Sequence, residues 1–124
     1  MSFLIVFFGA GLGGVARYST GTVMTRLSAL TSFPISTFTV NIAGSFLMGL
    51  VIGFLAMRNG LPDGWKLFLA TGFMGGFTTF SSFSLETAQL IENGDFSTAL
   101  IYVLSSVLLG ITALFAGLYL IRVL

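Results

Sequence analysis

Residues 72–84 read GFMGGFTTFSSFS, and this stretch decides the expected fold of the chain. It lies near the middle of a long apolar segment, Trp65–Glu92, and joins a pair of glycines to a run of hydroxyl side chains. Two adjacent glycines followed closely by two threonines make a poor helix interior. We therefore expect a helix that breaks near Gly75–Thr79, about halfway along its length.

The composition predicts that this helix lies in a membrane. Of the 124 residues, 56% are hydrophobic and only 7% are charged, whereas a soluble domain carries about 25% charged residues. Three further apolar segments cover about Phe3–Arg26, Ile35–Met57 and Phe96–Leu124. At about 1.5 Å per residue, each of the four segments can cross a hydrocarbon core of about 30 Å. We predict an all-α membrane protein, with residues 1–124 forming a single four-helix transmembrane domain.

Turn-forming and capping residues separate the four segments. They are Pro34 ahead of the second segment, the pairs Asn59-Gly60 and Asn93-Gly94 after the second and third, and Asp63 and Asp95 ahead of the third and fourth. Proline is tolerated in the first helical turn, Asn-Gly pairs favour helix ends, and aspartate favours the N-cap. The connections are short, so successive helices should run antiparallel.

The residues that are absent exclude several classes of function. The chain has no cysteine and no histidine, which removes thiol nucleophiles, imidazole bases and the usual zinc ligands. It has four carboxylates, and its net charge is +1. No basic region precedes the first apolar run, so Met1–Phe3 is expected to begin a mature helix. An enzyme and a nucleic-acid-binding protein are therefore both disfavoured.

Small residues at spacings of four predict close helix packing and an oligomer. The pairs are Gly9 with Gly13, Gly49 with Gly53, and Gly72 with Gly76. In membranes this spacing marks close contact between helix backbones. Some of that contact must lie within the chain, and its abundance favours a homo-oligomer. The few basic residues specify orientation only weakly, which leaves room for insertion in both directions.

A helix broken inside a membrane must be buried in protein or line a wet cavity. Its freed carbonyl and N–H groups are natural ligands for ions. Phe80 and Phe83 follow the break on one helix face. A ring edge is the positive end of the aromatic quadrupole, so two edges at a narrow passage would favour an anion.

Other polar residues inside the apolar segments have two interpretations each. Asn41 lies on a ridge of residues spaced by four, which begins at Thr37, and either links two helices or offers its amide N–H groups to a passing ion. Tyr102 and Ser106 share one helix face and form either a packing seam or part of a pore wall. Arg17 either extends to the interface or attracts anions in a vestibule.

Three of these features together resemble the Fluc (CrcB) family of bacterial fluoride channels. They are GGVARY at 13–18, Asn41 with its small-residue ridge, and the stretch 72–84, and the resemblance covers the whole chain. It implies an antiparallel, dual-topology homodimer in the bacterial plasma (inner) membrane, with two fluoride pores along the subunit interfaces. The implied activity is passive fluoride export, which protects the cell against fluoride toxicity.

The resemblance also implies roles for individual residues. It places Asn41, Phe80 and Phe83 along the fluoride pathway. It assigns a polar track to Thr37, Ser81, Glu86, Tyr102 and Ser106. It implies a structural sodium ion at the dimer interface, held by the backbone carbonyls of Gly75 and Thr78.

Two rival functions remain open. A small proton-coupled multidrug exporter has about this length and four helices, and it would use Glu86 as its membrane-embedded acid. The first helix has no acid, and Glu86 lies toward the end of the third. A non-transporting accessory subunit would instead need a second protein.

Overall fold

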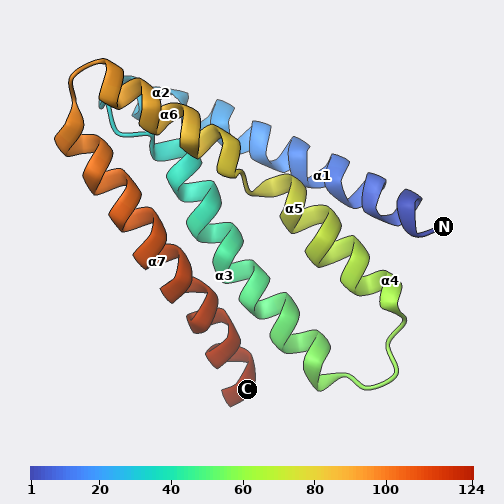
Figure 1. Ribbon diagram of the computed structural model, residues 1–124. Coiled ribbons are helices and arrows are strands. Elements are labelled where there is room, and N and C mark those ends of the chain that lie inside the picture. The colour runs from blue at the N-terminus through green and yellow to red at the C-terminus, as the bar shows by residue number, and fades with distance from the viewer.

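Helices are the only regular secondary structure in the computed structural model, which describes residues 1–124 (Figure 1). The elements are α1 (Ser2–Val23), α2 (Thr25–Ala29), α3 (Ile35–Met57), α4 (Asp63–Lys66), the π-helical η1 (Leu67–Met74), α5 (Gly75–Phe77), α6 (Phe80–Glu92) and α7 (Phe96–Val123). Three of them, α1, α3 and α7, are long and apolar enough to cross a membrane. The segment from α4 to α6 follows one course but is interrupted between α5 and α6.

The first apolar segment divides earlier than expected. It is expected to run as one helix to Arg26, but α1 ends at Val23 and the short α2 begins at Thr25. Met24 between them has φ −91° and ψ 8°. The Thr22 and Thr25 hydroxyls donate to backbone carbonyls of the preceding turn, and such back-bonding bends helices.

The expected helix caps hold for α7 but not for α4. The Asp95 side chain accepts a hydrogen bond from the Thr98 N–H, so it caps α7 as predicted. The prediction for Asp63 is wrong, because Pro62 occupies the N-cap position and Asp63 makes no capping bond. Asp63 is the first residue of α4, where its charge still complements the helix dipole.

The closest helix packing joins segments that are not neighbours in sequence. The helix α1 lies along η1 and α5, with Gly9 facing Phe68 and Gly13 facing Phe73. A Cβ atom on Gly13 would overlap the Phe73 carbonyl oxygen. Residue numbers rise together along both helices, so the two run parallel. Successive long segments consequently run in opposite directions, as Figure 1 also shows.

The helices α3 and α7 form a second parallel pair. Gly49 faces Gly117, and Gly53 faces Ile121 one turn further along both helices. All three predicted small-residue pairs therefore pack against other helices of the same chain. Their number alone does not require a second copy.

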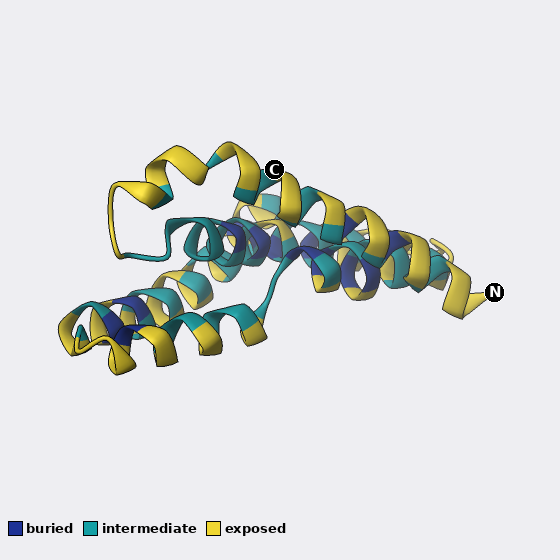
Figure 2. Cartoon of the chain, turned by 90° about the horizontal axis from the view of Figure 1, so that it is seen from above, coloured by how far each residue is buried: buried dark blue, intermediate teal, exposed yellow.

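The two pairs leave a thin molecule with a small interior. A core cluster of Leu90, Ala99 and Tyr102 joins the end of α6 to the start of α7. The outer faces of the helices are exposed along most of their length (Figure 2). Most of the large exposed side chains are apolar, which suits a surface covered by lipid or by another membrane helix.

Candidate functional site

The break in the third segment falls at two extended residues within the expected interval. The helix α5 ends at Phe77, and α6 begins at Phe80. Thr78 has φ −83° and ψ 159°, and Thr79 has φ −151° and ψ 119°. Both residues therefore adopt strand-like geometry between two helix ends.

Two hydrogen-bond donors at the break are diverted away from the helical ladder. In a continuous helix the Thr79 N–H would bond the Gly75 carbonyl, and the Ser82 N–H would bond the Thr78 carbonyl. Instead the Thr79 N–H donates to Asn41 Oδ1 at 2.8 Å. The Ser82 N–H donates to Thr79 Oγ1 at 3.2 Å. The carbonyl oxygens of Gly75 and Thr78 thereby lose their helical donors.

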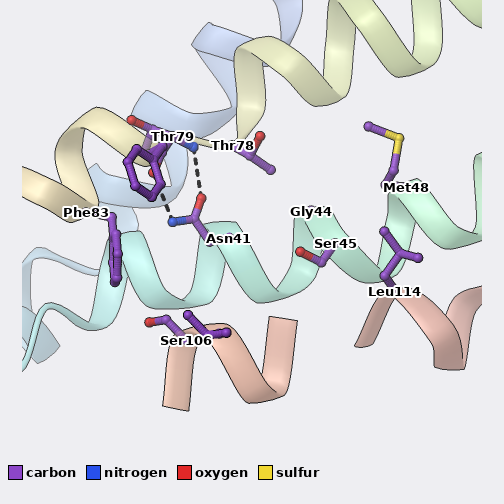
Figure 3. Close-up of a pocket in the computed structure, with 11 residues that line it drawn as sticks. Asn41, Gly44, Ser45, Met48, Thr78, Thr79, Phe83, Ser106 and Leu114 are labelled. Atoms are coloured by element: carbon purple, nitrogen blue, oxygen red, sulfur yellow. Dashed lines mark hydrogen bonds between the residues drawn. The ribbon is translucent and has the colours of Figure 1, made fainter. Parts of the chain in front are cut away.

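Asn41 holds the break to α3 by two hydrogen bonds to the same residue. Besides accepting from the Thr79 N–H, its Nδ2 donates to the Thr79 carbonyl oxygen at 3.0 Å. Figure 3 shows both bonds as dashed lines. An asparagine amide has two N–H donors, so one N–H of Asn41 has no protein partner. The helix-linking role left open by the sequence is thus filled, and one donor remains.

A groove of about 360 Å³ opens beside this contact, between the break, α3 and α7 (Figure 3). Its lining residues are Asn41, Gly44, Ser45, Met48, Thr78, Thr79, Phe80, Phe83, Ser106, Val107 and Leu114. Four residues predicted for the ion pathway therefore meet in one cavity: Asn41, Phe80, Phe83 and Ser106. No charged side chain lines it.

The two phenylalanines lie at different depths. Their ring centroids are 5.7 Å apart, with the ring planes at 44°. Phe83 is half-buried and packs on Tyr102, with ring centroids 5.0 Å apart. Phe80 is 78% exposed, so a single chain supplies no wall opposite its ring.

Three polar atoms behind Phe83 are buried without a hydrogen-bond partner. They are Ser106 Oγ, Tyr102 Oη and Glu86 Oε1. Tyr102 is 0% exposed, although its phenol is a good donor. Thr37 lies beside both Tyr102 and Glu86. Burying a polar group without a partner costs free energy, so this set requires another explanation than packing.

A second cavity of about 320 Å³ lies at one end of the molecule. Its walls carry mostly polar side chains from the end of α2, the α2–α3 loop, the start of α3 and the end of α6: Ser28, Thr31, Ser32, Ser36, Glu86, Gln89 and Asn93, together with Phe33, Pro34 and Leu90. We call it the vestibule. Glu86 is its only charged residue, and the sequence assigned a site role to none of the other residues in its walls.

Two predicted residues lie outside both cavities. Ser81 is exposed, and its hydroxyl lies 3.3 Å from Thr79 Oγ1. Arg17 is half-buried on α1, and its Nε has no hydrogen-bond partner. Conversely, sequence reasoning did not assign a site role to Thr79, whose main chain carries the contact with Asn41. Its position ahead of Phe80-Ser81-Ser82 fits the N-cap preference of threonine, which is the one signal that points to it.

Comparison with known proteins identifies the family. The model of the family described as "CrcB-like protein, Camphor Resistance (CrcB)" matches residues 4–118. The chain belongs to the CrcB family. Relatives within it are about half identical to this chain. A protein of Methylobacterium nodulans named fluoride-specific ion channel FluC is 52% identical over 119 residues, which cover 96% of this chain and 94% of the relative.

Two further relatives of this CrcB chain carry the same name. The protein of Granulibacter bethesdensis is 51% identical over 124 residues, or 100% of this chain and 97% of the relative. That of Rhodopseudomonas palustris is 49% identical over 122 residues, or 98% of both chains. The likeness therefore extends over the helices, the break and the loops of the CrcB chain together.

The groove of the CrcB chain offers donors without a full positive charge. The free Asn41 N–H and the phenylalanine ring edges can each approach a negative ion, and the Ser106 hydroxyl lies buried in the groove wall. The break supplies carbonyl oxygens on the same segment, which suit a cation. The donors and the carbonyl oxygens are separate groups, so the chain can bind an anion with one set and a cation with the other.

Proposed function

We propose that this chain is a fluoride-selective channel through which fluoride leaves the cytoplasm passively, and that it thereby protects the cell against fluoride toxicity. The relatives named as fluoride-specific channels support this over nearly the whole chain. The observation that carries it is the pair of buried hydroxyls without partners, Tyr102 Oη and Ser106 Oγ. Each can donate a hydrogen bond to an anion, so a transported ion would supply the partner that the protein does not.

Fluoride is small and strongly hydrated, so a pore must replace its water molecules with other donors. The Asn41 N–H and the Ser106 hydroxyl supply such donors in the groove, and the Phe80 and Phe83 ring edges add weaker positive potential. Because none of these groups carries a full charge, binding is favourable without trapping the ion. No bond is made or broken, and the protein is not an enzyme.

The proposed path runs from the groove to the vestibule along the polar track. Ser106 opens into the groove, and Tyr102 lies one turn away on α7. Glu86 reaches the vestibule, and Thr37 lies beside both Glu86 and Tyr102. An ion that passes the Phe83 edge would therefore meet the hydroxyls of Ser106, Tyr102 and Thr37 before the Glu86 carboxyl at the vestibule. Ser81, next to the exposed Phe80, would line the half of the path that a second chain completes.

The functional unit is an antiparallel homodimer in the bacterial inner membrane. The segment from α4 to α6 makes the fourth crossing, since it lies parallel to α1 over its first half. The exposed Phe80 ring and the open groove supply one wall of a pore. A second copy inserted in the opposite direction would supply the other wall, which gives two pores per dimer. Arg17, which lies outside both cavities of one chain, would attract fluoride at a pore entrance of the dimer.

A sodium ion would fit the carbonyl oxygens of Gly75 and Thr78. Both lose their helical donors at the break, and unwound backbone carbonyls are typical sodium ligands in membrane proteins. Two copies around a shared axis would present four such oxygens. The ion would hold the two breaks together. Preparation of the protein without sodium should lower its thermal stability, and added sodium should restore it.

Fluoride efflux from liposomes tests the function. The purified protein is reconstituted into vesicles loaded with potassium fluoride. A potassium ionophore lets potassium leave with the fluoride, so that no membrane potential builds up to stop the efflux. We expect rapid fluoride release and no chloride release under the same conditions, with no need for a proton gradient. Release no faster than from empty vesicles, or equal chloride release, would refute the proposal.

A further inference from the structure

The two-point contact between Asn41 and Thr79 determines which end of the Asn41 amide faces the groove. An asparagine side chain carries an acceptor oxygen and two N–H donors, so a freely rotating amide can serve a cation or an anion. Here Oδ1 accepts from the Thr79 N–H and Nδ2 donates to the Thr79 carbonyl. The reversed amide would set N–H against N–H and oxygen against oxygen. The orientation is therefore fixed by the main chain.

We propose that the main chain of Thr79 turns Asn41 into a one-sided donor, and that this contact is a determinant of anion-over-cation selectivity in the groove. The oxygen that could bind a cation is turned toward Thr79 and already accepts one hydrogen bond, and the one unpaired polar hydrogen belongs to Nδ2. The proposal rests on the channel function above. It adds Thr79 as a positioning residue that acts through Asn41.

The neighbouring contacts hold the Thr79 main chain in place for this role. Thr79 Oγ1 accepts from the Ser82 N–H, which anchors the residue as the N-cap of α6. On α3, Gly44 lies one turn after Asn41, and a Cβ atom there would overlap Thr78 Cγ2. The absence of that atom lets the break approach α3 closely enough for both bonds to form.

The hydrogen bond accepted by Oδ1 also strengthens the remaining donor. It draws electron density from the amide nitrogen toward Oδ1, which makes the Nδ2 hydrogens more positive. Hydrogen bonds linked in this way reinforce each other in surroundings of low dielectric constant. The free N–H of Asn41 is thus a better anion ligand than that of an amide whose oxygen accepts no bond.

Replacement of one main-chain amide by an ester tests the proposal. An ester at residue 79, built from the hydroxy-acid analogue of threonine, removes the Thr79 N–H and keeps its side chain. The matched control is an ester at Phe38 on α3, outside both cavities, where the N–H donates to the Pro34 carbonyl. The readout is the fluoride-over-sodium permeability ratio from reversal potentials. A loss of folded channels lowers the current but not the ratio of those that remain.

We expect the ester at residue 79 to lower this ratio about tenfold or more, the effect of misdirecting one hydrogen bond to an ion, with little change for the ester at residue 38. An unchanged ratio with the ester at residue 79, or an equal loss in both variants, would overturn the proposal. If wild-type protein passes no fluoride, the channel function fails instead.

Hydrogen exchange tests the contact without relying on transport. In Asn41→Ala the Thr79 N–H should exchange about tenfold faster or more, because its acceptor is gone. The Thr78 N–H should keep its wild-type rate and serves as the internal reference. Equal Thr79 exchange in wild type and variant would show that the contact does not form.

Discussion

At the scale of single residues, the site depends on polar groups that the protein leaves unsatisfied. Ser106, Tyr102 and Glu86 each bury an oxygen that has no partner in the chain. Such an arrangement lowers stability and persists where function requires it. Stability and transport should therefore respond in opposite directions when one of these oxygens is removed.

Tyr102→Phe makes that contrast measurable. The phenol is 0% exposed and its oxygen is unpaired, so its removal should stabilise the protein by about 1 kcal/mol. Fluoride efflux should fall in the same variant. Tyr119→Phe is the control, since Tyr119 lies on the same helix but is exposed, and it should alter neither thermal unfolding nor efflux. A Tyr102→Phe protein that is less stable with normal efflux would contradict the assignment.

At the scale of helices, the arrangement follows from close contacts within two parallel pairs. Two adjacent glycines on α1, Gly13 and Gly14, allow the effect of helix packing on stability to be measured apart from the effect of helix propensity. A Cβ atom on Gly13 meets the backbone of Phe73 and Phe77, whereas one on Gly14 meets nothing within 4 Å. The break directly follows α5, which packs against α1 at Gly13, so this contact also positions the site.

Gly13→Ala and Gly14→Ala should consequently change the stability of the protein in opposite directions. The first must push α1 away from η1 and should destabilise the protein by about 1–3 kcal/mol, the usual cost of overpacking. The second gains helix propensity of up to about 1 kcal/mol without a clash. Thermal unfolding in a fixed detergent compares them directly, and equal effects would show that the two helices are further apart than described here.

The cap of α7 predicts a pH dependence at one end of the bundle. Hydrogen bonding to Thr98 lowers the pKa of Asp95 below its usual value, with a further contribution from Ser32. A lowered pKa in the folded state means that the ionised carboxylate stabilises the fold above its ordinary pKa. That contribution is lost as the pH falls through the folded value.

Asp95→Asn should remove this dependence, because asparagine is also a good N-cap but does not titrate. Thermal unfolding temperature measured from neutral pH to about pH 3 should decline less in the variant than in the wild type. Parallel declines would mean that other carboxylates carry the acid sensitivity.

At the scale of the whole molecule, one chain supplies half of an ion pathway. Its groove is open, its Phe80 ring is exposed, and its two freed carbonyls offer an incomplete set of cation ligands. The small-residue pairs pack within the chain, so they do not provide the argument for a second copy. The argument for a second copy comes from the open pathway, which one chain leaves without its other wall.

Dual topology can be tested with single cysteines, since the chain has none. Asn59 follows α3, and Asn93 lies near the opposite end of that helix, where Ser32 bonds Asp95. With a membrane-impermeant thiol reagent on intact cells, Asn59→Cys and Asn93→Cys should each label to about half, as expected for insertion in both directions. Full labelling of one variant and none of the other would establish a single orientation, and labelling after solubilisation controls for reactivity.

Much of this architecture could be predicted from the sequence, because it follows from local composition. Long apolar segments predict helices for a membrane, Gly75-Gly76 and Thr78-Thr79 weaken one of them, and Asp95 caps another. These features depend on residues within a few positions of each other. The division of the first segment at Met24 was missed, because hydroxyl back-bonding competes weakly with helix propensity.

The pairing of the helices and the working of the site were decided by tertiary structure alone. The spacing of Gly9, Gly13, Gly49 and Gly53 indicates close contact but not its partner, since any helix can approach a small residue. The bond from Asn41 to Thr79 joins residues 38 positions apart in the sequence. Its two ends share no local pattern, and only the packing of α3 against the break brings them together. The sequence by itself therefore determined which helices form and where one breaks, while the fold decided which atoms at that break remain free for an ion.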